Sequence, residues 1–356
     1  MKNISEEMTK ESLERIDVEG MYEAVRSFPD LLREGRRRAL KVETRGWPGT
    51  GINGVVVAGM GGSAIGGDIL SALAANHATV PIAVARSYSL PAWVGPDTAV
   101  VTSSYSGNTE ETLAAFDDAC ERGARVLAIS TGGSLAAKAE ERDIPLIHLP
   151  SGIQPRAALP HSLSALLTVT EPLRLIDVKP DDWAEAASIT DAQSKVMAKM
   201  TDPENPAVVL ARALYGYFPV IYSSEQFAAA NTRWRNQIHE NAKSLAVGNL
   251  LPEMNHNEVM GWARFQPELK QLAVVVLRDI DDHTRTQRRM DVTRSLLEPH
   301  AQSWHEIWSE GSSLLARLLS IMYVSDWVSL YLAIMNNTDP SPVGLISRLK
   351  AALVEG

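Results

Sequence analysis

The sequence predicts an α/β protein with two doubly wound, flavodoxin-like parallel sheets, each sandwiched between helices in a three-layer αβα arrangement. Short apolar runs alternate with helical patterns in the first half of the chain, and a second series begins after about residue 180. Continuous apolar runs of this kind are typical of parallel strands that are buried on both faces. The length of 356 residues also suits two domains, each with its own core.

Five short runs predict the first sheet. They end in small or polar residues and comprise GVVVAG (54–59), PIAVARS (81–87), TAVVTSS (98–104), RVLAIS (125–130) and IPLIHL (144–149). The helical patterns between these runs supply the crossovers that parallel strands require. Residues 21–41, ahead of the first run, predict a helical, arginine-rich segment.

A second sheet is predicted from FPVIYSS (218–224), LAVVVLRD (272–279) and SWHEIWSE (303–310). The stretch VKPDDW (178–183) separates the two halves. The chain is therefore expected to comprise a helical prefix (1–40), a first domain (41–178) and a second domain (179–356). Residues 312–354 predict one long and one shorter helix on either side of NNTDPSP.

Composition restricts the location and the partners of the protein. The 34 Lys and Arg against 43 Asp and Glu give a net charge of −9, which disfavours binding to nucleic acid or to an anionic membrane. A single cysteine, Cys120, cannot form an internal disulfide, and the polar N-terminus lacks a signal-peptide pattern. Arg317 and Asp326 interrupt the apolar stretch 313–335, which predicts a buried helix. We therefore expect a cytoplasmic protein.

The segment GMGGSAIGGD (59–68) after the first predicted strand is a candidate phosphate site. Gly61 and Gly62 allow the backbone to approach a ligand closely, and Ser63 falls near the first turn of a predicted helix. The free N–H groups and the dipole of a helix N-terminus favour an anion at this position. A phosphate site is the natural interpretation.

Two other interpretations of this segment stay open. Gly59, Gly61 and Ala64 also match the looser dinucleotide pattern G-x-G-x-x-A, which would suit an NAD(P)-binding oxidoreductase. The second predicted strand, however, ends in Arg86-Ser87-Tyr88 and not in an acid that could hold a ribose. Alternatively, the glycines serve only the packing of helix against strand.

The loop TSSYSGNTEETL (102–113) follows the third predicted strand and opens a helix. Ser104, Ser106 and Thr109 place three hydroxyl groups around a turn in which Gly107 exposes backbone donors. Hydroxyl and N–H groups at a helix N-terminus can surround a phosphate without any Lys or Arg. For any one of these residues, a simple helix-capping role is the alternative.

Taken together, S-Y-S-G-N-T-E-E-T and G-M-G-G-S resemble the phosphosugar-binding signature of sugar-isomerase (SIS) domains. Their paired form most resembles the bifunctional phosphoglucose/phosphomannose isomerase family, and the similarity extends from about residue 20 to the end. The resemblance implies two sugar-isomerase domains and a homodimer whose active site lies at the interface. It also implies a phosphate-binding set, namely Gly61, Gly62, Ser63, Ser104, Ser106, Gly107 and Thr109.

Two later segments resemble the catalytic stretch of that family. Within NTRWRNQIHENAKSLAVGN (231–249), the resemblance assigns Glu240 as the catalytic base. Within LPEMNHNEVMGW (251–262), it assigns His256 as the ring-opening acid/base, supplied by the partner subunit. Aldose–ketose isomerisation needs a base that moves a proton between C1 and C2, and it needs stabilisation of an enediolate. Outside this match, a helical Glu is usually a solvated surface residue and a loop His is usually structural.

Two cations complete the expected site. SGIQPRAALPH (151–161) resembles the family segment whose Arg stabilises the enediolate, which points to Arg156; a simple ion pair with a nearby carboxylate is the alternative. ISRLKAAL (346–353) contains Lys350, which matches a Lys that assists ring opening, although a Lys on an amphipathic helix is routinely solvated. Ser341 is a further candidate for contact with the sugar.

No metal and no cofactor are expected. The tract from His239 to Lys243 lacks the second His of the zinc motif H-E-x-x-H, and the eight His residues are scattered. The predicted function is isomerisation of glucose 6-phosphate, fructose 6-phosphate and mannose 6-phosphate by metal-free cis-enediol proton transfer. A phosphosugar-binding regulator without catalytic activity is the alternative from another class, but no basic helix-turn-helix pattern accompanies the fold. An aminotransferring synthase would need a glutaminase domain with a nucleophilic cysteine.

Overall fold

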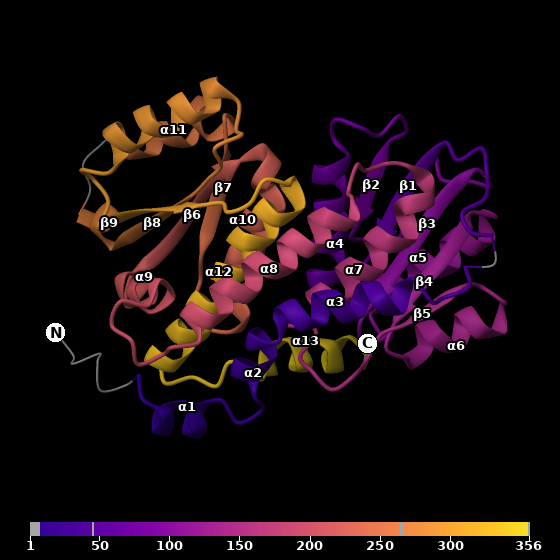
Figure 1. Cartoon of the computed structure of the whole chain (residues 1–356), viewed down its shortest axis with the longest axis horizontal. Coiled ribbons are helices and arrows are strands. Elements are labelled where there is room, and N and C mark those ends of the chain that lie inside the picture. The colour runs from indigo at the N-terminus through magenta and orange to yellow at the C-terminus, as the bar shows by residue number, and fades with distance from the viewer. Residues whose placement is uncertain (1–7, 45, 264–266, 355–356) are drawn as a thin grey trace.

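The computed structural model describes residues 8–44, 46–263 and 267–354, and it contains two parallel sheets with helices packed between and around them (Figure 1). The first sheet has the order β2-β1-β3-β4-β5, and the second has the order β7-β6-β8-β9. All neighbouring strands run parallel. The prediction of two doubly wound α/β sheets is confirmed.

The strands of the first sheet are β1 (Gly54–Ala58), β2 (Ile82–Ala85), β3 (Thr98–Ser104), β4 (Arg125–Ser130) and β5 (Leu146–His148). Each lies within a run that the sequence analysis predicted. Val55 and Val57 face the helices on one side of the sheet, and Val56 faces those on the other side. All three are fully buried, which explains why these strands lack polar alternation.

The strands of the second sheet are β6 (Phe218–Ser224), β7 (Val247–Leu251), β8 (Leu272–Arg278) and β9 (Ser303–Trp308). The runs predicted for β6, β8 and β9 are confirmed, whereas the sequence analysis missed β7. This strand lies at the edge of the sheet and is largely half-buried. Its sequence VGNLL contains Gly248 and Asn249, which are poor strand formers, so backbone pairing with β6 defines it.

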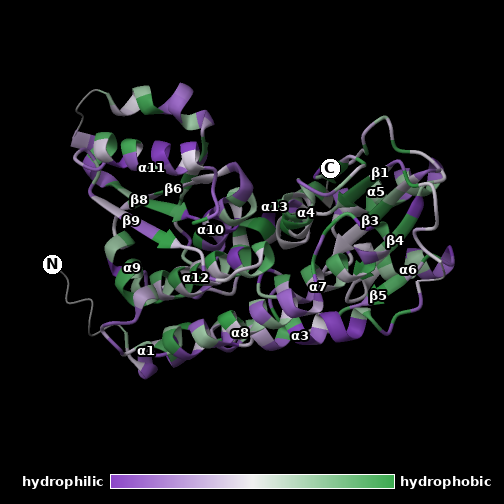
Figure 2. Ribbon diagram, turned by 45° about the horizontal axis from the view of Figure 1, so that its top comes forward, coloured by the Kyte–Doolittle hydropathy of each residue, from purple (hydrophilic) through white to green (hydrophobic). Residues whose placement is uncertain are grey.

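The helices of the first half are α1 (Lys10–Ile16), α2 (Met21–Arg26), α3 (Phe28–Ala39), α4 (Gly61–Ala74), α5 (Glu110–Glu121), α6 (Gly133–Glu141) and α7 (Leu159–Thr170). Those of the second half are α8 (Pro180–Met197), α9 (Pro206–Leu214), α10 (Ala228–Glu240), α11 (Thr284–Leu297), α12 (Leu314–Met335) and α13 (Gly344–Val354). In Figure 2 the strands of the first sheet are mainly green, whereas surface helices such as α3 carry purple, hydrophilic residues.

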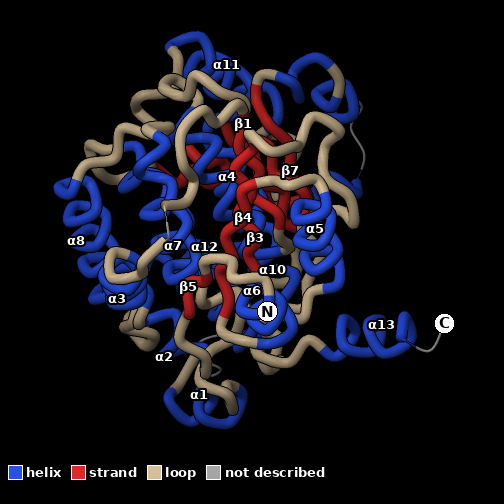
Figure 3. The backbone as a smooth tube through the Cα atoms, turned by 90° about the vertical axis from the view of Figure 1, so that its right-hand side faces the viewer, coloured by secondary structure: helices blue, strands red, loops and turns tan. Residues whose placement is uncertain are grey.

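Helix α12 forms the centre of the second half. It is the one helix among the described residues that is long and apolar enough to cross a membrane, but 94% of its most apolar window is buried inside the protein. Core helices of globular proteins pass the same length and composition test, so the expectation of a buried helix is confirmed. In contrast, α13 projects from the rest of the molecule (Figure 3) and exposes Leu345, Leu349 and Leu353.

A carboxylate from α8 caps the start of α12. The backbone N–H groups of Ser312 and Ser313 donate to Glu185 at 2.7 and 2.9 Å. Burial alone would raise the pKa of Glu185, but hydrogen bonds from these two serines outweigh it and lower the pKa to about 2. Since the folded-state pKa lies below the ordinary 4.5, the stabilisation is complete above pH 4.5 and is lost as the pH falls toward 2.

We therefore expect Glu185→Gln to reduce the free energy of unfolding by about 1 kcal/mol at pH 7. The difference from wild type should shrink between pH 4.5 and pH 3, because in this range the carboxyl group takes up a proton in the unfolded chain while it stays ionised in the folded protein. Urea denaturation at several pH values measures both effects. Glu121→Gln, at an exposed position on α5, is the control and should leave the free energy of unfolding at pH 7 unchanged.

Candidate active site

The two loops predicted to bind phosphate lie side by side at the carboxyl edge of the first sheet. They follow β1 and β3, which are neighbours in the sheet although β2 lies between them in the sequence. This change of direction is a topological switch point, where α/β proteins of this type bind ligands. A Cβ on Gly59, at the end of β1, would lie 2.7 Å from the carbonyl oxygen of Ser103. Any larger residue at this position would therefore push the two loops apart.

The first loop leads directly into α4, which begins at Gly61. Met60 is in the N-cap position and provides no side-chain cap, and the first turn of the helix contains no acidic residue. Gly61 has a φ of +51°, a conformation that favours glycine. The N-terminus of α4 thus presents uncapped backbone donors beside Ser63, which is the arrangement that an anion requires.

The second loop brings the predicted hydroxyl groups together. The oxygens of Ser104 and Thr109 lie 2.9 Å apart, and the Gly107 N–H donates to the Ser104 hydroxyl at 3.1 Å. Thr109 is the N-cap residue of α5, but its hydroxyl makes no capping bond to that helix. The alternative of a simple cap therefore does not describe Thr109. The Ser106 hydroxyl accepts from the Asn108 N–H at 3.3 Å, in an exposed part of the loop.

Gly107 provides a direct test of this loop. Its φ is +70°, and a Cβ at this position would lie only 1.8 Å from the carbonyl oxygen of Gly132. We expect Gly107→Ala to displace the loop, to lower the melting temperature and to weaken the binding of a sugar phosphate at least tenfold, because the strain alone costs about 1–3 kcal/mol. Gly95→Ala, at a site with open space around it, is the matched control and should change neither property.

Arg156 and Glu240 meet where the segment before α7 contacts the end of α10. Glu240 is the last residue of α10, and its Oε2 lies 3.6 Å from Nη1 of Arg156. Arg156 belongs to the segment between β5 and α7 and is 5% exposed, whereas the Glu240 side chain is 30% exposed. Burial lowers the pKa of Arg156, and the Glu240 carboxylate opposes that shift. The ion pair considered for Arg156 in the sequence analysis is thus present, and its partner is Glu240.

The Arg156–Glu240 pair adjoins the first phosphate loop. A Cβ on Gly62 would lie 3.7 Å from the carbonyl oxygen of Pro155, the residue that precedes Arg156. The N-terminus of α4 and the segment that carries Arg156 therefore lie next to each other.

Sequence reasoning missed two residues next to Glu240. Asn241 accepts a hydrogen bond from Nε of Arg156 at 2.6 Å. Lys243 donates to the carbonyl oxygens of Pro340, at 3.0 Å, and of Glu240. Burial and the nearby Arg156 lower the pKa of Lys243, which has a φ of +53° where glycine is usual. The closeness of Asn241 and Lys243 to Glu240 in the sequence was the available signal, but it does not reveal which groups these two residues contact.

A cavity with a volume of about 770 Å³ opens beside Glu240 and Lys243. The stretch from Thr338 to Arg348, which connects α12 to α13, forms its other wall. Ser341 is buried within this stretch, and its hydroxyl oxygen has no hydrogen-bond partner among the described residues. The cavity therefore combines an acid, a cation and an apolar wall.

The structure does not bring His256 and Lys350 to this pair within one chain. His256 ends the short 3-10 helix η4 (Glu253–His256) after β7, where it is exposed and has no hydrogen-bond or ion-pair partner in the part of the chain that is described. Lys350 is exposed on α13 and does not line the cavity, although Arg348 of the same helix does. Of the four predicted catalytic residues, only Arg156 and Glu240 are in contact.

Among residues 8–44, 46–263 and 267–354, no group of three or more His, Cys, Asp or Glu side chains is placed to hold a metal ion. The one carboxylate of the predicted catalytic set, Glu240, is paired with Arg156. The arrangement offers a half-exposed carboxylate, a buried guanidinium 3.6 Å away and an uncapped helix N-terminus nearby.

Comparison with known proteins identifies the family. Residues 203–353 match the family model for the bacterial phospho-glucose isomerase C-terminal SIS domain. The bifunctional phosphoglucose/phosphomannose isomerase of Caldicellulosiruptor bescii is 39% identical over 341 residues, which are 94% of this chain and 99% of that protein. The chain belongs to the bifunctional phosphoglucose/phosphomannose isomerase family. The resemblance identified from the two loops and the catalytic segments is therefore confirmed.

Other family members and solved structures agree. The bifunctional phosphoglucose/phosphomannose isomerase of Aquifex aeolicus is 38% identical over 306 residues, covering 85% of this chain and 91% of that protein. A glucose-6-phosphate isomerase-like protein from Thermus thermophilus superposes with a TM-score of 0.64 at 19% identity, covering 99% of each chain. A hypothetical protein from the same organism has a TM-score of 0.71 at 18% identity, covering 99% of this chain and 95% of its own. At these identities, the solved structures establish the fold.

Proposed function

We propose that this protein interconverts glucose 6-phosphate and fructose 6-phosphate, and also mannose 6-phosphate and fructose 6-phosphate, by proton transfer through a cis-enediol. The observation that carries the proposal is the 3.6 Å contact between Glu240 and Arg156 beside the Gly62 loop. Membership of the family supports the substrate class. The proposed reaction requires no metal and no cofactor.

The phosphate of the substrate is bound by the two loops at the switch point. The N-terminus of α4 provides backbone donors, and the loop after β3 provides hydroxyl groups. The proposed phosphate ligands are Gly61, Gly62, Ser63, Ser104, Ser106, Gly107 and Thr109. Because none of them is charged, the helix dipole and the number of donors supply the affinity.

Glu240 acts as the base that removes the C2 proton of an aldose and returns it at C1. The half-exposed carboxylate is accessible from the cavity, and Arg156 holds it in place. As the proton leaves, negative charge develops on the oxygens at C1 and C2, and the buried guanidinium of Arg156 stabilises it. A substrate hydroxyl group would also supply the partner that the Ser341 oxygen lacks.

We infer that the active form is a homodimer in which His256 of one subunit opens the sugar ring in the other. An exposed histidine without a partner among the described residues of its own chain supports this assignment, as does the exposed apolar face of α13. Lys350, on the same helix, would assist ring opening once α13 is packed in the dimer. The division of the chain into residues 1–40, 41–178 and 179–356 likewise remains a prediction.

Mixed dimers test this inference. We expect His256→Ala and Glu240→Gln to be nearly inactive alone, whereas co-expression should restore about one quarter of wild-type activity, because half of the dimers are mixed and each has one intact site. If His256 served its own subunit, every site would keep one defect. Co-expression without any recovery, in dimers shown to be mixed, would contradict the assignment.

The activity itself is tested by a coupled assay of the purified protein with fructose 6-phosphate and mannose 6-phosphate in parallel, in the presence of a chelator. Turnover of both substrates is the expected result. Turnover of one substrate would limit the proposal to a single isomerase. Binding of both sugar phosphates without turnover of either would contradict the proposal and favour a regulatory protein of the same fold.

A further inference from the structure

We propose that Asn241, held in orientation by Ser329 of α12, is a positioning residue that sets the Arg156 guanidinium beside Glu240. This inference rests on the proposed function, in which Arg156 stabilises the enediolate. Neither Asn241 nor Ser329 faces the cavity, so both residues act through Arg156. Their contribution is therefore one of orientation.

The side-chain amide of Asn241 forms one hydrogen bond through its oxygen and one through its nitrogen, and together these bonds define its orientation. The Oδ1 atom accepts from Nε of Arg156 at 2.6 Å, and the Nδ2 group donates to the Ser329 hydroxyl at 3.0 Å. The Ser329 hydroxyl in turn donates to the backbone carbonyl of Asp326 at 3.0 Å, so its lone pairs are left to accept from Asn241. If the amide were rotated by 180°, its N–H donors would face the N–H donors of the Arg156 guanidinium, and a guanidinium group has no acceptor.

The bond to Nε decides where the free end of the guanidinium points. Nη2 of Arg156 donates to the carbonyl oxygens of Ser341, at 3.0 Å, and of Pro340. Two contacts at Nη2 would still allow the guanidinium group to pivot about that nitrogen. The third contact, from Nε to Asn241, prevents the pivot and leaves Nη1 directed at Glu240, 3.6 Å away. A planar group that is held at two of its nitrogens presents the third at a defined place.

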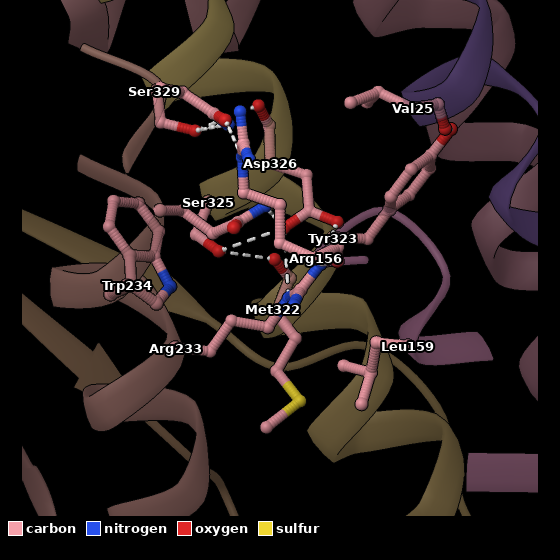
Figure 4. Close-up of polar contacts among 12 residues, drawn as sticks. Val25, Arg156, Leu159, Arg233, Trp234, Met322, Tyr323, Ser325, Asp326 and Ser329 are labelled. Carbon is pink, nitrogen blue, oxygen red and sulfur yellow. Dashed lines mark hydrogen bonds and ion pairs between the residues drawn. The ribbon is translucent and has the colours of Figure 1, made fainter. Parts of the chain in front are cut away.

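Helix α12 also holds the backbone of Arg156. Its Asp326 accepts from Nε and Nη2 of Arg233 at 2.9 and 2.6 Å, and Nη2 of Arg233 donates to the carbonyl oxygen of Arg156 at 3.1 Å. Figure 4 shows Arg156, Arg233, Asp326 and Ser329 gathered in one buried cluster. Asp326 and Ser329 are three residues apart and so lie on the same face of α12. One helix face thereby orients the backbone of Arg156 through Arg233 and its side chain through Asn241.

The neutral amide suits this role better than a carboxylate. An Asp at position 241 could also accept from Arg156, but its negative charge would neutralise the guanidinium at hydrogen-bond distance. In a buried site such a charge would offset the attraction of Arg156 for the enediolate. Asn241 accepts the hydrogen bond and leaves the positive charge of Arg156 directed at the reacting oxygens.

The first experiment compares Ser329→Ala with Ser320→Ala. Both serines are fully buried on α12, and each hydroxyl donates to a carbonyl three residues earlier and accepts one N–H. The accepted N–H comes from Asn241 for Ser329 and from the Glu310 backbone for Ser320. We expect the two variants to lose similar amounts of melting temperature. In Ser329→Ala alone, kcat should also fall about tenfold with KM unchanged, because a small displacement of a catalytic group lowers the reaction rate strongly. Equal kcat values for the two variants would overturn the proposal.

The second variant is Asn241→Asp, which keeps the shape and the acceptor but replaces the donor to Ser329 by a charged oxygen. We expect kcat to fall by tenfold or more while the KM for fructose 6-phosphate stays close to that of wild type. The melting temperature should fall no further than in Ser329→Ala, because both variants lose the same hydrogen bond. A loss of kcat larger than that of Ser329→Ala at an equal melting temperature is a result that a purely structural asparagine would not produce. Wild-type kcat in Asn241→Asp would overturn the proposal.

The Arg156 Nε–H resonance, assigned by comparison with Arg156→Lys, provides a readout that does not depend on activity. We expect its hydrogen exchange to be slow in wild type and in Ser320→Ala, and faster in Ser329→Ala. If the wild type turned over no hexose phosphate, the proposed function would fail, but the exchange rates would still decide the positioning role. Equally slow exchange in all three proteins would overturn that role.

Discussion

Replacing Glu240 by Gln should lower kcat by about 10³-fold, within the range that a general base contributes. The carboxamide has nearly the same shape and keeps an oxygen facing Arg156, but it cannot take the substrate proton. We therefore expect the fold and the affinity for sugar phosphates to persist. Steady-state assays in both directions, together with isothermal titration of fructose 6-phosphate, measure the two effects separately.

Glu171→Gln is the matched control for this variant. Glu171 is exposed to a similar extent, 35% against 30% for Glu240, and it also pairs with an arginine, Arg36, at 2.6 Å. It lies at the end of α7, in the short 3-10 helix η2 (Glu171–Leu173), and does not line the cavity. We expect its kcat to equal that of wild type. If Glu240→Gln retained more than a tenth of wild-type kcat, Glu240 would not be the base.

The largest effect on stability is expected for Asp326→Ala. Asp326 and Arg233 are almost completely buried, and the carboxylate accepts two hydrogen bonds from the guanidinium and one from Gln237 at 2.8 Å. Removing the carboxylate leaves a buried arginine charge without its partner. Such a loss costs about 3–5 kcal/mol of the free energy of unfolding. Chemical denaturation of the variant and the wild type measures this cost.

Two comparisons distinguish this effect from a generic loss of an ion pair. Glu298→Ala breaks the exposed pair with Arg294, whose side chains are both 43% exposed, and should cost less than about 1 kcal/mol. Replacing both partners, as in Arg233→Met with Asp326→Leu, removes the uncompensated charge and should recover much of the loss. If Asp326→Ala lowered the free energy of unfolding no more than Glu298→Ala does, the Arg233–Asp326 pair would not stabilise the core as described.

The proposed dimer explains why the single chain contains an incomplete site. Arg156 and Glu240 are already in contact, and Asn241 and the carbonyl groups of residues 340 and 341 hold the arginine. His256 and Lys350 are exposed on elements at the surface. The proton-transfer part of the proposed site is thus formed within one subunit. The ring-opening part would be added by association.

The sequence by itself determined the strands of both sheets except β7, and it identified the two loops with their glycines and hydroxyl groups. These features are local: apolar runs, turn residues and helix starts lie within a few residues of one another. It also pointed to Glu240 and Arg156, through short motifs that resemble those of the family, and the structure brings these two residues into contact. A half-buried edge strand such as β7 carries too weak a local pattern to be recognised in this way.

Only the tertiary structure decided how Arg156 is held. Its partners Asn241 and Ser341 lie 85 and 185 residues further along the chain, and both are buried against α12 or its continuation. No local pattern encodes such contacts, because they arise when the segments before α7, after α10 and after α12 pack together. The sequence therefore determines which groups can perform the chemistry, whereas the packing of distant helices determines where those groups point.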